Sequence, residues 1–239
     1  MEVVTVLVPV HNEAETIEDL FFSFDSLLRE NSFKPKFLVV NDASSDGTLE
    51  EIRRLRETRG YQISILNLKF NVGQHASLVV GARHLQDTDF VLVTDADLQN
   101  PPETVIPMIH QLKAGSYNII YGLRRQNRLG NGFLSKIFWL TISLFSFFRI
   151  PPDQTPLKVF DREFIEGFKK LGSYSFIFFP YNLARVRAKV GFYPVTTRPR
   201  KKGLSKYNLL SKAKLFAKVW ATIIFGYGFD WKVEVLETY

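Results

Sequence analysis

The sequence predicts an α/β fold built on a mostly parallel central sheet. Apolar runs of strand length alternate with segments whose apolar residues recur at helical spacing. Short polar motifs follow the ends of these runs, where open α/β sheets bind their ligands. The 239 residues, 46% of them hydrophobic, suffice for one domain with a buried core. A glycine-rich dinucleotide fingerprint and a Walker A motif are both absent, which excludes the usual dinucleotide and P-loop folds.

The expected elements follow in regular order. Strands are expected at residues 4–10, 37–40, 63–66, 90–93 and 119–121. Helices are expected at residues 16–29, 48–58 and 105–113, with a further one beginning near Gly73. In the first helix the apolar residues share one face. Ser45 or Asp46 is the expected cap of the second helix.

The most specific local motif is D-A-D-L-Q-N-P-P-E at residues 95–103, directly after an apolar strand. Asp95 and Asp97 are two residues apart, so on an extended chain they point to the same side. Pro101 and Pro102 then end regular pairing. Because two neighbouring carboxylates repel each other unless a cation lies between them, the motif predicts a divalent metal site. The alternative is a loop with two solvated aspartates.

Charge is unevenly distributed along the chain. The net charge is +7, and no Asp or Glu occurs between Gly167 and Phe229, a stretch rich in Lys and Arg. This asymmetry predicts a polyanionic partner such as nucleic acid, an anionic membrane or a phosphorylated ligand, or else a solvated basic face. The absence of Cys excludes disulfides and cysteine-ligated zinc. The N-terminus resembles a first strand rather than a signal peptide, so a cytoplasmic protein is expected.

Two apolar stretches with basic flanks, residues 137–148 and 219–229, are too short to cross a bilayer alone. Their aromatic content favours an interfacial helix or a buried core helix. We therefore expect a basic, amphipathic C-terminal segment at residues 213–239.

Six motifs occur in the order found in family 2 glycosyltransferases of the GT-A fold, which this sequence resembles over nearly its whole length. They are V-P-V-H-N-E (8–13), V-V-N-D-A-S-S-D-G-T (39–48), N-V-G-Q-H-A-S-L-V-V-G (71–81), D-A-D-L-Q-N-P-P-E (95–103), Y-G-L-R-R-Q-N-R (121–128) and G-L-S-K-Y (203–207). The fourth motif and the late Arg200–Tyr207 pattern resemble polyprenyl-phosphate glycosyltransferases, including dolichyl-phosphate mannose synthases and bacterial undecaprenyl-phosphate enzymes. The sequence departs from them in residues 151–163, which lack their usual glycine, and in stopping soon after Phe229, where many bacterial relatives carry two transmembrane helices.

The resemblance implies roles for particular residues on the donor side. Asp95 and Asp97, with Gln99, would bind Mg²⁺ or Mn²⁺ and so bridge the diphosphate of a nucleotide sugar, UDP more readily than GDP. The remaining nucleotide contacts implied for this side are Pro9, Asn12, Glu13 and Asp42.

On the acceptor side, the resemblance implies that basic residues hold the phosphate of the lipid. The candidates are Arg124, Arg125, Arg128 and Ser135. A loop with Arg200, Ser205 and Lys206 would close over the donor diphosphate. Each basic residue has a solvated loop as its alternative reading. We assign residues 1–123 to a nucleotide-binding half and 124–212 to an acceptor-binding half.

A polyprenyl phosphate is already ionised near neutral pH, so it needs no strong general base. The family inverts the anomeric centre. An acceptor hydroxyl would instead need a carboxylate base, for which Asp153 and Asp161 are candidates. His75 is expected to be structural. The expected enzyme works on the cytoplasmic face of a membrane, beside an anionic surface and with an integral anchor protein as a further partner.

Three other functions compete with this one. The first is a glycosyltransferase with a soluble glycan acceptor. The second is a nucleic-acid-binding module, which leaves the D-A-D-L-Q motif unexplained, so no nucleic-acid partner is expected. The third is a nucleotidyltransferase, which usually opens with a basic glycine-rich loop where this chain has acidic residues.

Overall fold

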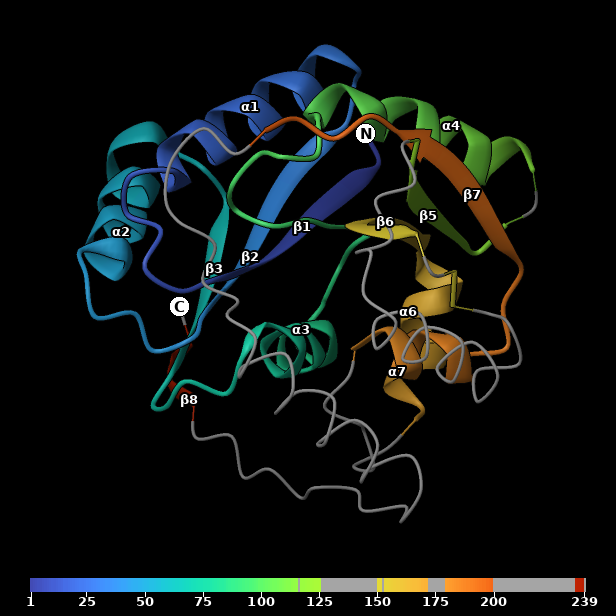
Figure 1. Ribbon diagram of the computed structural model, residues 1–239. Coiled ribbons are helices and arrows are strands. Elements are labelled where there is room, and N and C mark those ends of the chain that lie inside the picture. The colour runs from blue at the N-terminus through green and yellow to red at the C-terminus, as the bar shows by residue number, and fades with distance from the viewer. Residues whose placement is uncertain (116, 126–149, 152, 172–178, 200–234, 239) are drawn as a thin grey trace.

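The structure is a computed structural model and describes residues 1–115, 117–125, 150–151, 153–171, 179–199 and 235–238 (Figure 1). Its centre is an eight-stranded sheet with the strand order β7-β5-β6-β4-β1-β2-β3-β8. The strands are β1 (Val3–Val10), β2 (Lys34–Asn41), β3 (Ile63–Leu68), β4 (Phe90–Val93), β5 (Ile119–Arg124), β6 (Gln154–Asp161), β7 (Val190–Val195) and β8 (Val235–Thr238).

Most neighbouring strands run parallel. The parallel pairs are β1 with β2 and β4, β2 with β3, and β5 with β7. Two strands run the other way: β6 lies antiparallel between β4 and β5, and β8 lies antiparallel along β3. The predicted mostly parallel sheet is therefore confirmed.

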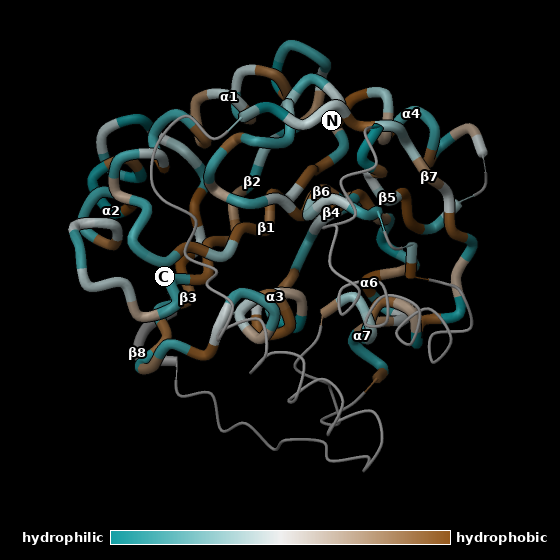
Figure 2. Tube along the Cα trace, viewed as in Figure 1, coloured by the Kyte–Doolittle hydropathy of each residue, from teal (hydrophilic) through white to brown (hydrophobic). Residues whose placement is uncertain are grey.

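Helices cover both faces of the sheet. They are α1 (Ile17–Glu30), α2 (Thr48–Arg59), α3 (Gln74–Arg83), α4 (Val105–Ala114), α6 (Arg162–Lys169) and α7 (Phe179–Arg185), with a 3₁₀ turn, η1 (Pro102–Thr104). One core cluster joins α1, α2 and α4 to one face, and a second joins α3, α6 and α7 to the other. Figure 1 shows these two helical layers above and below the sheet, and Figure 2 shows hydrophobic residues along the strands between them.

Each strand and helix expected in the first 121 residues is present, with ends shifted by a few residues. Their local patterns are strong: β1 is almost entirely buried, and the predicted apolar face of α1 packs on the sheet. Asp46 accepts a hydrogen bond from the backbone N–H of Thr48 at 3.0 Å, although Gly47 is the residue at the N-cap position of α2.

The sequence did not predict the elements after residue 150. In β6, Pro156 and Lys158 interrupt the apolar pattern, which hides the strand. The fold tolerates Pro156 because β4 pairs with β6 only from Lys158 onward, and the pairing of β5 with β6 shifts register between Tyr121 and Leu123. Pro156 thus lies where β6 forms no regular strand pairing with either neighbour, so its missing N–H removes no ladder hydrogen bond.

Several expectations fall outside the described residues. They concern the apolar stretches 137–148 and 219–229, the basic C-terminal segment, and site candidates Arg128, Ser135, Arg200, Ser205 and Lys206. Within the described ranges, no helix combines the length and hydropathy that crossing a bilayer requires.

Candidate active site

The carboxyl ends of β1, β2 and β4 meet at one edge of the sheet, because these strands are parallel neighbours. The strand β6 is antiparallel to β4, so its beginning at Gln154 lies at the same edge. Most of the polar motifs in the sequence therefore converge here. The predicted residues placed at this edge are Pro9, Asn12, Glu13, Asp42, Asp95, Asp97, Gln99, Arg124 and Arg125.

The loops after β1 and β2 are interlocked by hydrogen bonds. The side-chain oxygen of Asn12 accepts from the backbone N–H of Ser45 at 2.8 Å, and the N–H of Asn12 donates to the hydroxyl of Ser44 at 3.0 Å. The N–H of Glu13 donates to the hydroxyl of Thr48 at 2.8 Å. Asn12 has a φ of 56°, a left-handed conformation that Asn tolerates well. Asn12 and Glu13 thus tie the loop after β1 to the loop after β2.

Asp42 is buried and organises the entry to α3. Its two carboxylate oxygens accept from the backbone N–H groups of Val72 at 2.7 Å and Gly73 at 2.9 Å. Only 3% of the residue is exposed. The sequence signal for this arrangement was N-V-G at the start of the helix, where Gly73 has a φ of 89°. Contact between Asp42 and a nucleotide stays a prediction.

The aspartates of the D-A-D-L-Q motif lie in a turn after β4. The chain does not continue extended, since residues 96–97 form a turn and Leu98 has a φ of 53°. Burial nevertheless alternates: Ala96 is in the core, while Asp95 and Asp97 are both partly exposed. Both carboxylates are thus partly open to solvent, but the extended chain from which a shared side was predicted is not present, and that part of the expectation stays a prediction.

Hydrogen bonds hold this loop from three directions. The side-chain amide of Gln74, in the first turn of α3, donates to Asp95. The N–H of Gln99 donates to Asp97 at 3.1 Å within the loop. The carbonyl oxygen of Gln99 accepts from the N–H of Arg198 at 2.7 Å. The segment that leads towards the predicted basic loop at 200–206 is thus anchored on the aspartate loop.

The donor atoms of this loop fit a hard divalent ion. In the part of the chain that is described, no three His, Cys, Asp or Glu side chains gather into a potential metal cluster. Ions such as Mg²⁺ are often held by one or two carboxylates, with substrate phosphates and water in the other positions. Two partly exposed carboxylates and the amide of Gln99 match that chemistry.

A buried cation, which the sequence did not flag, lies beside the aspartate loop. Lys158 of β6 is 4% exposed, and its Nζ donates to the carbonyl oxygens of Thr155 at 2.9 Å and Pro156 at 3.2 Å. Burial lowers the pKa of Lys158 to about 8, against the effect of nearby Asp95. The only signal in the sequence was a lone lysine in the apolar run P-L-K-V-F.

His75 lies in the first turn of α3, close enough to Lys158 to sense its charge. Burial lowers the pKa of His75 to about 4, and Lys158 adds to that shift. The imidazole is therefore neutral near pH 7 and adds no charge to the aspartate loop.

The end of β5 places Arg124 at the same edge. Its N–H donates to the carbonyl oxygen of Asp153 at 2.9 Å. Its side-chain Nε is enclosed and has no hydrogen-bond partner among the described residues. Such a guanidinium suits a phosphate oxygen. Arg125 is exposed, and its N–H donates to Val195 at 3.0 Å.

Asp161 does not belong to this site. It pairs with Phe90 at the opposite end of β4, about 10 Å away along four residues of strand. Its carboxylate caps α6 by accepting from the N–H of Phe164 at 2.8 Å, and it also accepts from Asn118 at 3.1 Å. Asp161 is therefore a structural cap, and its candidacy as a catalytic base is wrong.

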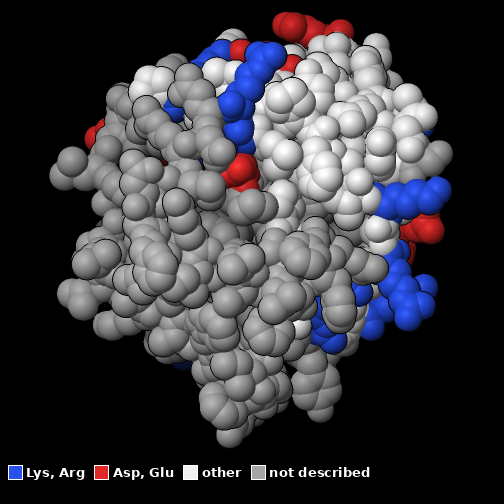
Figure 3. All heavy atoms as spheres, turned by 45° about the vertical axis from the view of Figure 1, so that its right-hand side comes forward, with Lys and Arg blue, Asp and Glu red and all other residues white. Residues whose placement is uncertain are grey.

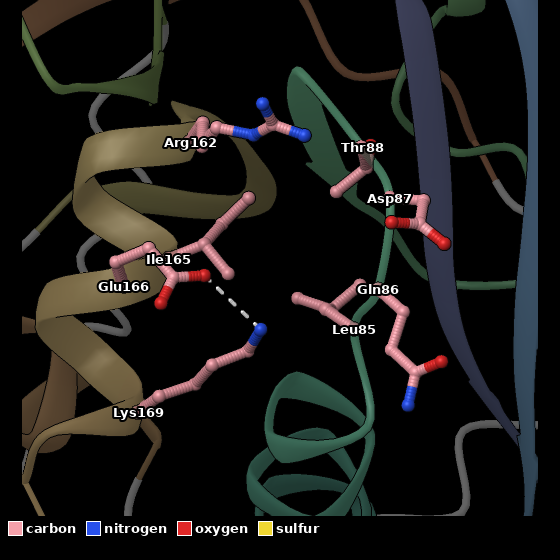
Figure 4. A pocket seen from close by; sticks show the side chains of 8 residues that line it. All are labelled: Leu85, Gln86, Asp87, Thr88, Arg162, Ile165, Glu166 and Lys169. Carbon is pink, nitrogen blue, oxygen red and sulfur yellow. Dashed lines mark hydrogen bonds and ion pairs between the residues drawn. The ribbon is translucent and has the colours of Figure 1, made fainter.

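A cavity of about 430 Å³ lies at that opposite edge, between the start of β4 and α6 (Figure 4). Figure 4 shows Arg162 and the Glu166–Lys169 ion pair on one wall, facing Leu85 and Thr88. None of the predicted site residues lines this cavity. On the face in Figure 3, the described basic side chains lie in separate groups.

Comparisons with known proteins bear on the family and the fold of the chain. Residues 5–171 match the family model described as glycosyl transferase family 2. An uncharacterised glycosyltransferase of Synechocystis is 29% identical over 208 residues, covering 85% of this chain and 64% of the relative. The undecaprenyl-phosphate 4-deoxy-4-formamido-L-arabinose transferase of Sodalis glossinidius is 34% identical over 130 residues, covering 54% of this chain. The chain spans less than two thirds of both relatives, 39% in the second case.

Solved structures share the fold. A mannosyltransferase from Pyrobaculum calidifontis in complex with GDP-Man and Mn²⁺ superposes with a TM-score of 0.62 at 22% identity, covering 93% of this chain and 64% of that one. Glucosyl-3-phosphoglycerate synthase of Mycobacterium tuberculosis, in complex with Mn²⁺, UDP and phosphoglyceric acid, gives a TM-score of 0.67 at 15% identity, covering 94% and 78%. The predicted GT-A fold is therefore confirmed.

Proposed function

Because the chain belongs to glycosyl transferase family 2 and is a glycosyltransferase, we propose that it transfers a sugar from a nucleotide sugar to a polyprenyl phosphate, with inversion. We propose UDP rather than GDP as the nucleotide, and Mg²⁺ or Mn²⁺ as the ion. The observation that carries the proposal is the pair of partly exposed aspartates, Asp95 and Asp97, at the carboxyl edge of the sheet. The named function of the arabinose transferase relatives supports the lipid acceptor.

On the donor side, Asp95 and Asp97 would hold the ion together with Gln99, and Asn12, Glu13, Pro9 and Asp42 would form the nucleotide pocket. When bound, the ion offsets negative charge on the departing diphosphate. The protein contributes alignment, because hydrogen bonds from Gln74 and from the backbone of Gln99 fix the two carboxylates before substrate arrives.

On the acceptor side, Arg124 is only partly buried at the end of β5, and its guanidinium would donate to an acceptor phosphate oxygen. Arg125, Arg128 and Ser135 are proposed to complete that subsite, with residues 124–212 as the acceptor half and 1–123 as the nucleotide half. The positive charge of these arginines would reduce the repulsion between the acceptor phosphate and the donor diphosphate. An ionised phosphate would attack the anomeric carbon without a general base. Of the two carboxylates considered as a base for a hydroxyl acceptor, Asp161 lies at the opposite edge, while Asp153 lies beside Arg124.

We propose that the enzyme works at the cytoplasmic face of a membrane. The support is the excess of basic residues after Gly167 and the lipid-linked function in the name of the arabinose transferase relatives. Each basic residue near an anionic leaflet contributes about 1 kcal/mol to binding. Residues 213–239 would form an interfacial or packing segment, and an integral anchor protein would be a further partner. Arg200, Ser205 and Lys206 would close over the donor.

The deciding experiment is mass spectrometry of a lipid extract. The protein is incubated with Mn²⁺ or Mg²⁺, undecaprenyl phosphate in detergent, and a panel of UDP- and GDP-sugars. We expect a lipid product heavier by one sugar, whose rate of formation falls about 100-fold or more in Asp97→Asn. The matched control is Asp87→Asn, since Asp87 is exposed, lies at the opposite edge and has a φ of 44° that Asn adopts readily.

The competing candidate is a soluble acceptor, and the same panel tests it. Sugar transfer to soluble glycans or to phosphorylated small molecules, with no lipid product under any condition, would overturn the lipid acceptor while keeping the glycosyltransferase assignment. Equal lipid product from wild type and Asp97→Asn would overturn the role of the aspartate loop.

A further inference from the structure

A short segment joins the two sides of the proposed site. The strand β7 pairs with β5 up to its last residue, Val195, whose carbonyl oxygen accepts from the N–H of Arg125 at 3.0 Å. Three residues later, the N–H of Arg198 donates to the carbonyl oxygen of Gln99 at 2.7 Å. This crossing segment, residues 195–198, therefore runs from the arginines at the end of β5 to the aspartate loop (Figure 1).

A second contact fixes the end of the crossing segment. The guanidinium of Arg198 forms an ion pair with Glu103, which ends the D-A-D-L-Q-N-P-P-E motif and belongs to η1. Both side chains are at least half exposed, so the pair adds little to the free energy of unfolding. Arg198 thus holds the aspartate loop through its backbone at one point and through its side chain at another.

Among the described strands, pairing alone does not fix the distance between the two sides. The strand β6 lies between β4 and β5, and its pairing with β4 ends at Val93, before the aspartate loop begins. The pairing of β6 with β5 shifts register between Tyr121 and Leu123, just before the arginines. Three residues of chain span at most about 11 Å, so the crossing segment limits how far the aspartate loop can move from the end of β7.

We propose that Arg198 and Glu103 are positioning residues, which hold the aspartate loop at a fixed distance from the arginines of the acceptor side. The inference rests on the proposed function, in which that loop binds the donor diphosphate, while Arg124 and Arg125 bind the acceptor phosphate. Reacting atoms must lie about 3 Å apart and aligned, and a misplacement of about 1 Å can lower the rate about 100-fold. Loosening the ion pair therefore slows the transfer step more than it weakens the binding of either substrate.

Two neutral variants test this role by the rate of product formation and by titration calorimetry with UDP. In Glu103→Gln and in Arg198→Gln, we expect kcat to fall about fivefold. The affinity for UDP in saturating Mn²⁺ and the KM for the acceptor should stay within about twofold of wild type. A purely electrostatic role predicts a different result, because removing a negative and removing a positive charge near a diphosphate shift its binding in opposite directions.

Exchanging the two charges provides a rescue. The double variant Glu103→Arg with Arg198→Glu restores the ion pair with its direction reversed, so its kcat should return to within about twofold of wild type.

The matched control is another exposed ion pair. Lys113 pairs with Glu2 at 2.7 Å, and their side chains are 46% and 43% exposed, against 50% and 59% for Arg198 and Glu103. Glu2 directly precedes β1 and so lies at the opposite edge of the sheet. We expect Glu2→Gln to keep kcat and the affinity for UDP within about twofold of wild type.

Hydrogen exchange tests the same contact without any substrate. The amide of Arg198, which is hydrogen-bonded to Gln99, should exchange about threefold faster in Glu103→Gln and at the wild-type rate in Glu2→Gln. An unchanged exchange rate in Glu103→Gln would mean that the ion pair does not hold the loop, and would overturn the proposal.

Three kinetic results would also overturn it. They are an unchanged kcat in both neutral variants, shifts of UDP affinity in opposite directions that account for the rates, and no recovery in the double variant. Failure of the proposed function gives a different result. Wild type would then form no lipid product, the comparison of kcat would be made with the soluble acceptor, and the Arg198 amide would still respond to Glu103→Gln.

Discussion

Asp42 shows at the scale of single residues how a buried carboxylate prepares the site. The sequence placed it in an N-D-A-S-S-D-G-T motif, where a turn residue or a ligand contact were both reasonable readings. In the fold, each of its oxygens accepts a backbone N–H at the entry to α3. The start of α3, whose Gln74 donates to Asp95, therefore depends on a carboxylate from the loop that follows β2.

We predict that Asp42→Asn lowers the free energy of unfolding by about 1–3 kcal/mol. The amide keeps one acceptor but turns an NH₂ group towards a backbone N–H, which leaves a buried donor unsatisfied. Urea denaturation measures the change. Asp87→Asn, at an exposed position, is the control and should stay within about 0.5 kcal/mol. If Asp42→Asn unfolded at the same urea concentration as wild type, the two hydrogen bonds of Asp42 would contribute nothing to the free energy of unfolding.

At the scale of elements, the position of α3 is set by contact with β1 and β2. A Cβ atom at Gly81 would lie 2.4 Å from Leu7 Cδ1 and 2.8 Å from Val40 Cγ2. Glycine therefore lets the helix approach the sheet closely, at a position where its helix propensity is poor. Since α3 begins with Gln74 and His75, its distance from the sheet also sets the geometry around Asp95.

Gly81→Ala tests this close approach. Alanine is the better helix former by about 1 kcal/mol, but the overlap with Leu7 and Val40 should cost more, so we expect a net loss of about 1–2 kcal/mol. The comparison variant is Gly47→Ala, because a Cβ there meets no atom within 4 Å and the φ of −73° is ordinary, so its only expected cost is the poorer N-cap propensity of Ala, about 0.5 kcal/mol. Thermal and urea unfolding of both variants give the comparison. A Gly81→Ala variant as stable as Gly47→Ala would contradict the packing argument.

At the scale of the whole molecule, the last described residues return to the sheet. The strand β8 pairs antiparallel with β3, joining Leu66, Asn67 and Leu68 to residues 235–238 (Figure 1). Without that strand, β3 would present unpaired backbone groups at the edge of the sheet.

We predict that removing residues 235–239 lowers the free energy of unfolding by about 1–3 kcal/mol and promotes self-association through β3. The midpoint of urea unfolding and the elution volume in size-exclusion chromatography report the two effects. A truncated chain with the midpoint and elution of the full chain would show that β8 adds nothing to the sheet.

By itself the sequence determined the strands and helices of the first 121 residues, the loops that carry the polar motifs, and the carboxylate pair in residues 95–103 on which the proposed metal site rests. These features are local. Hydrophobic periodicity, turn residues and the repulsion between nearby carboxylates each depend on residues only a few positions apart in the sequence. The Asp95 and Asp97 pair was found in this way.

Only the tertiary structure decided which distant segments meet. It inserted β6 antiparallel between β4 and β5, which put Lys158 opposite Val93, two residues before Asp95, and Asp161 at the other end of β4. It also turned Asp42 towards Val72 and Gly73. The physical reason is that strand pairing and the burial of a charge depend on partners far along the chain, whose identity a local pattern does not contain.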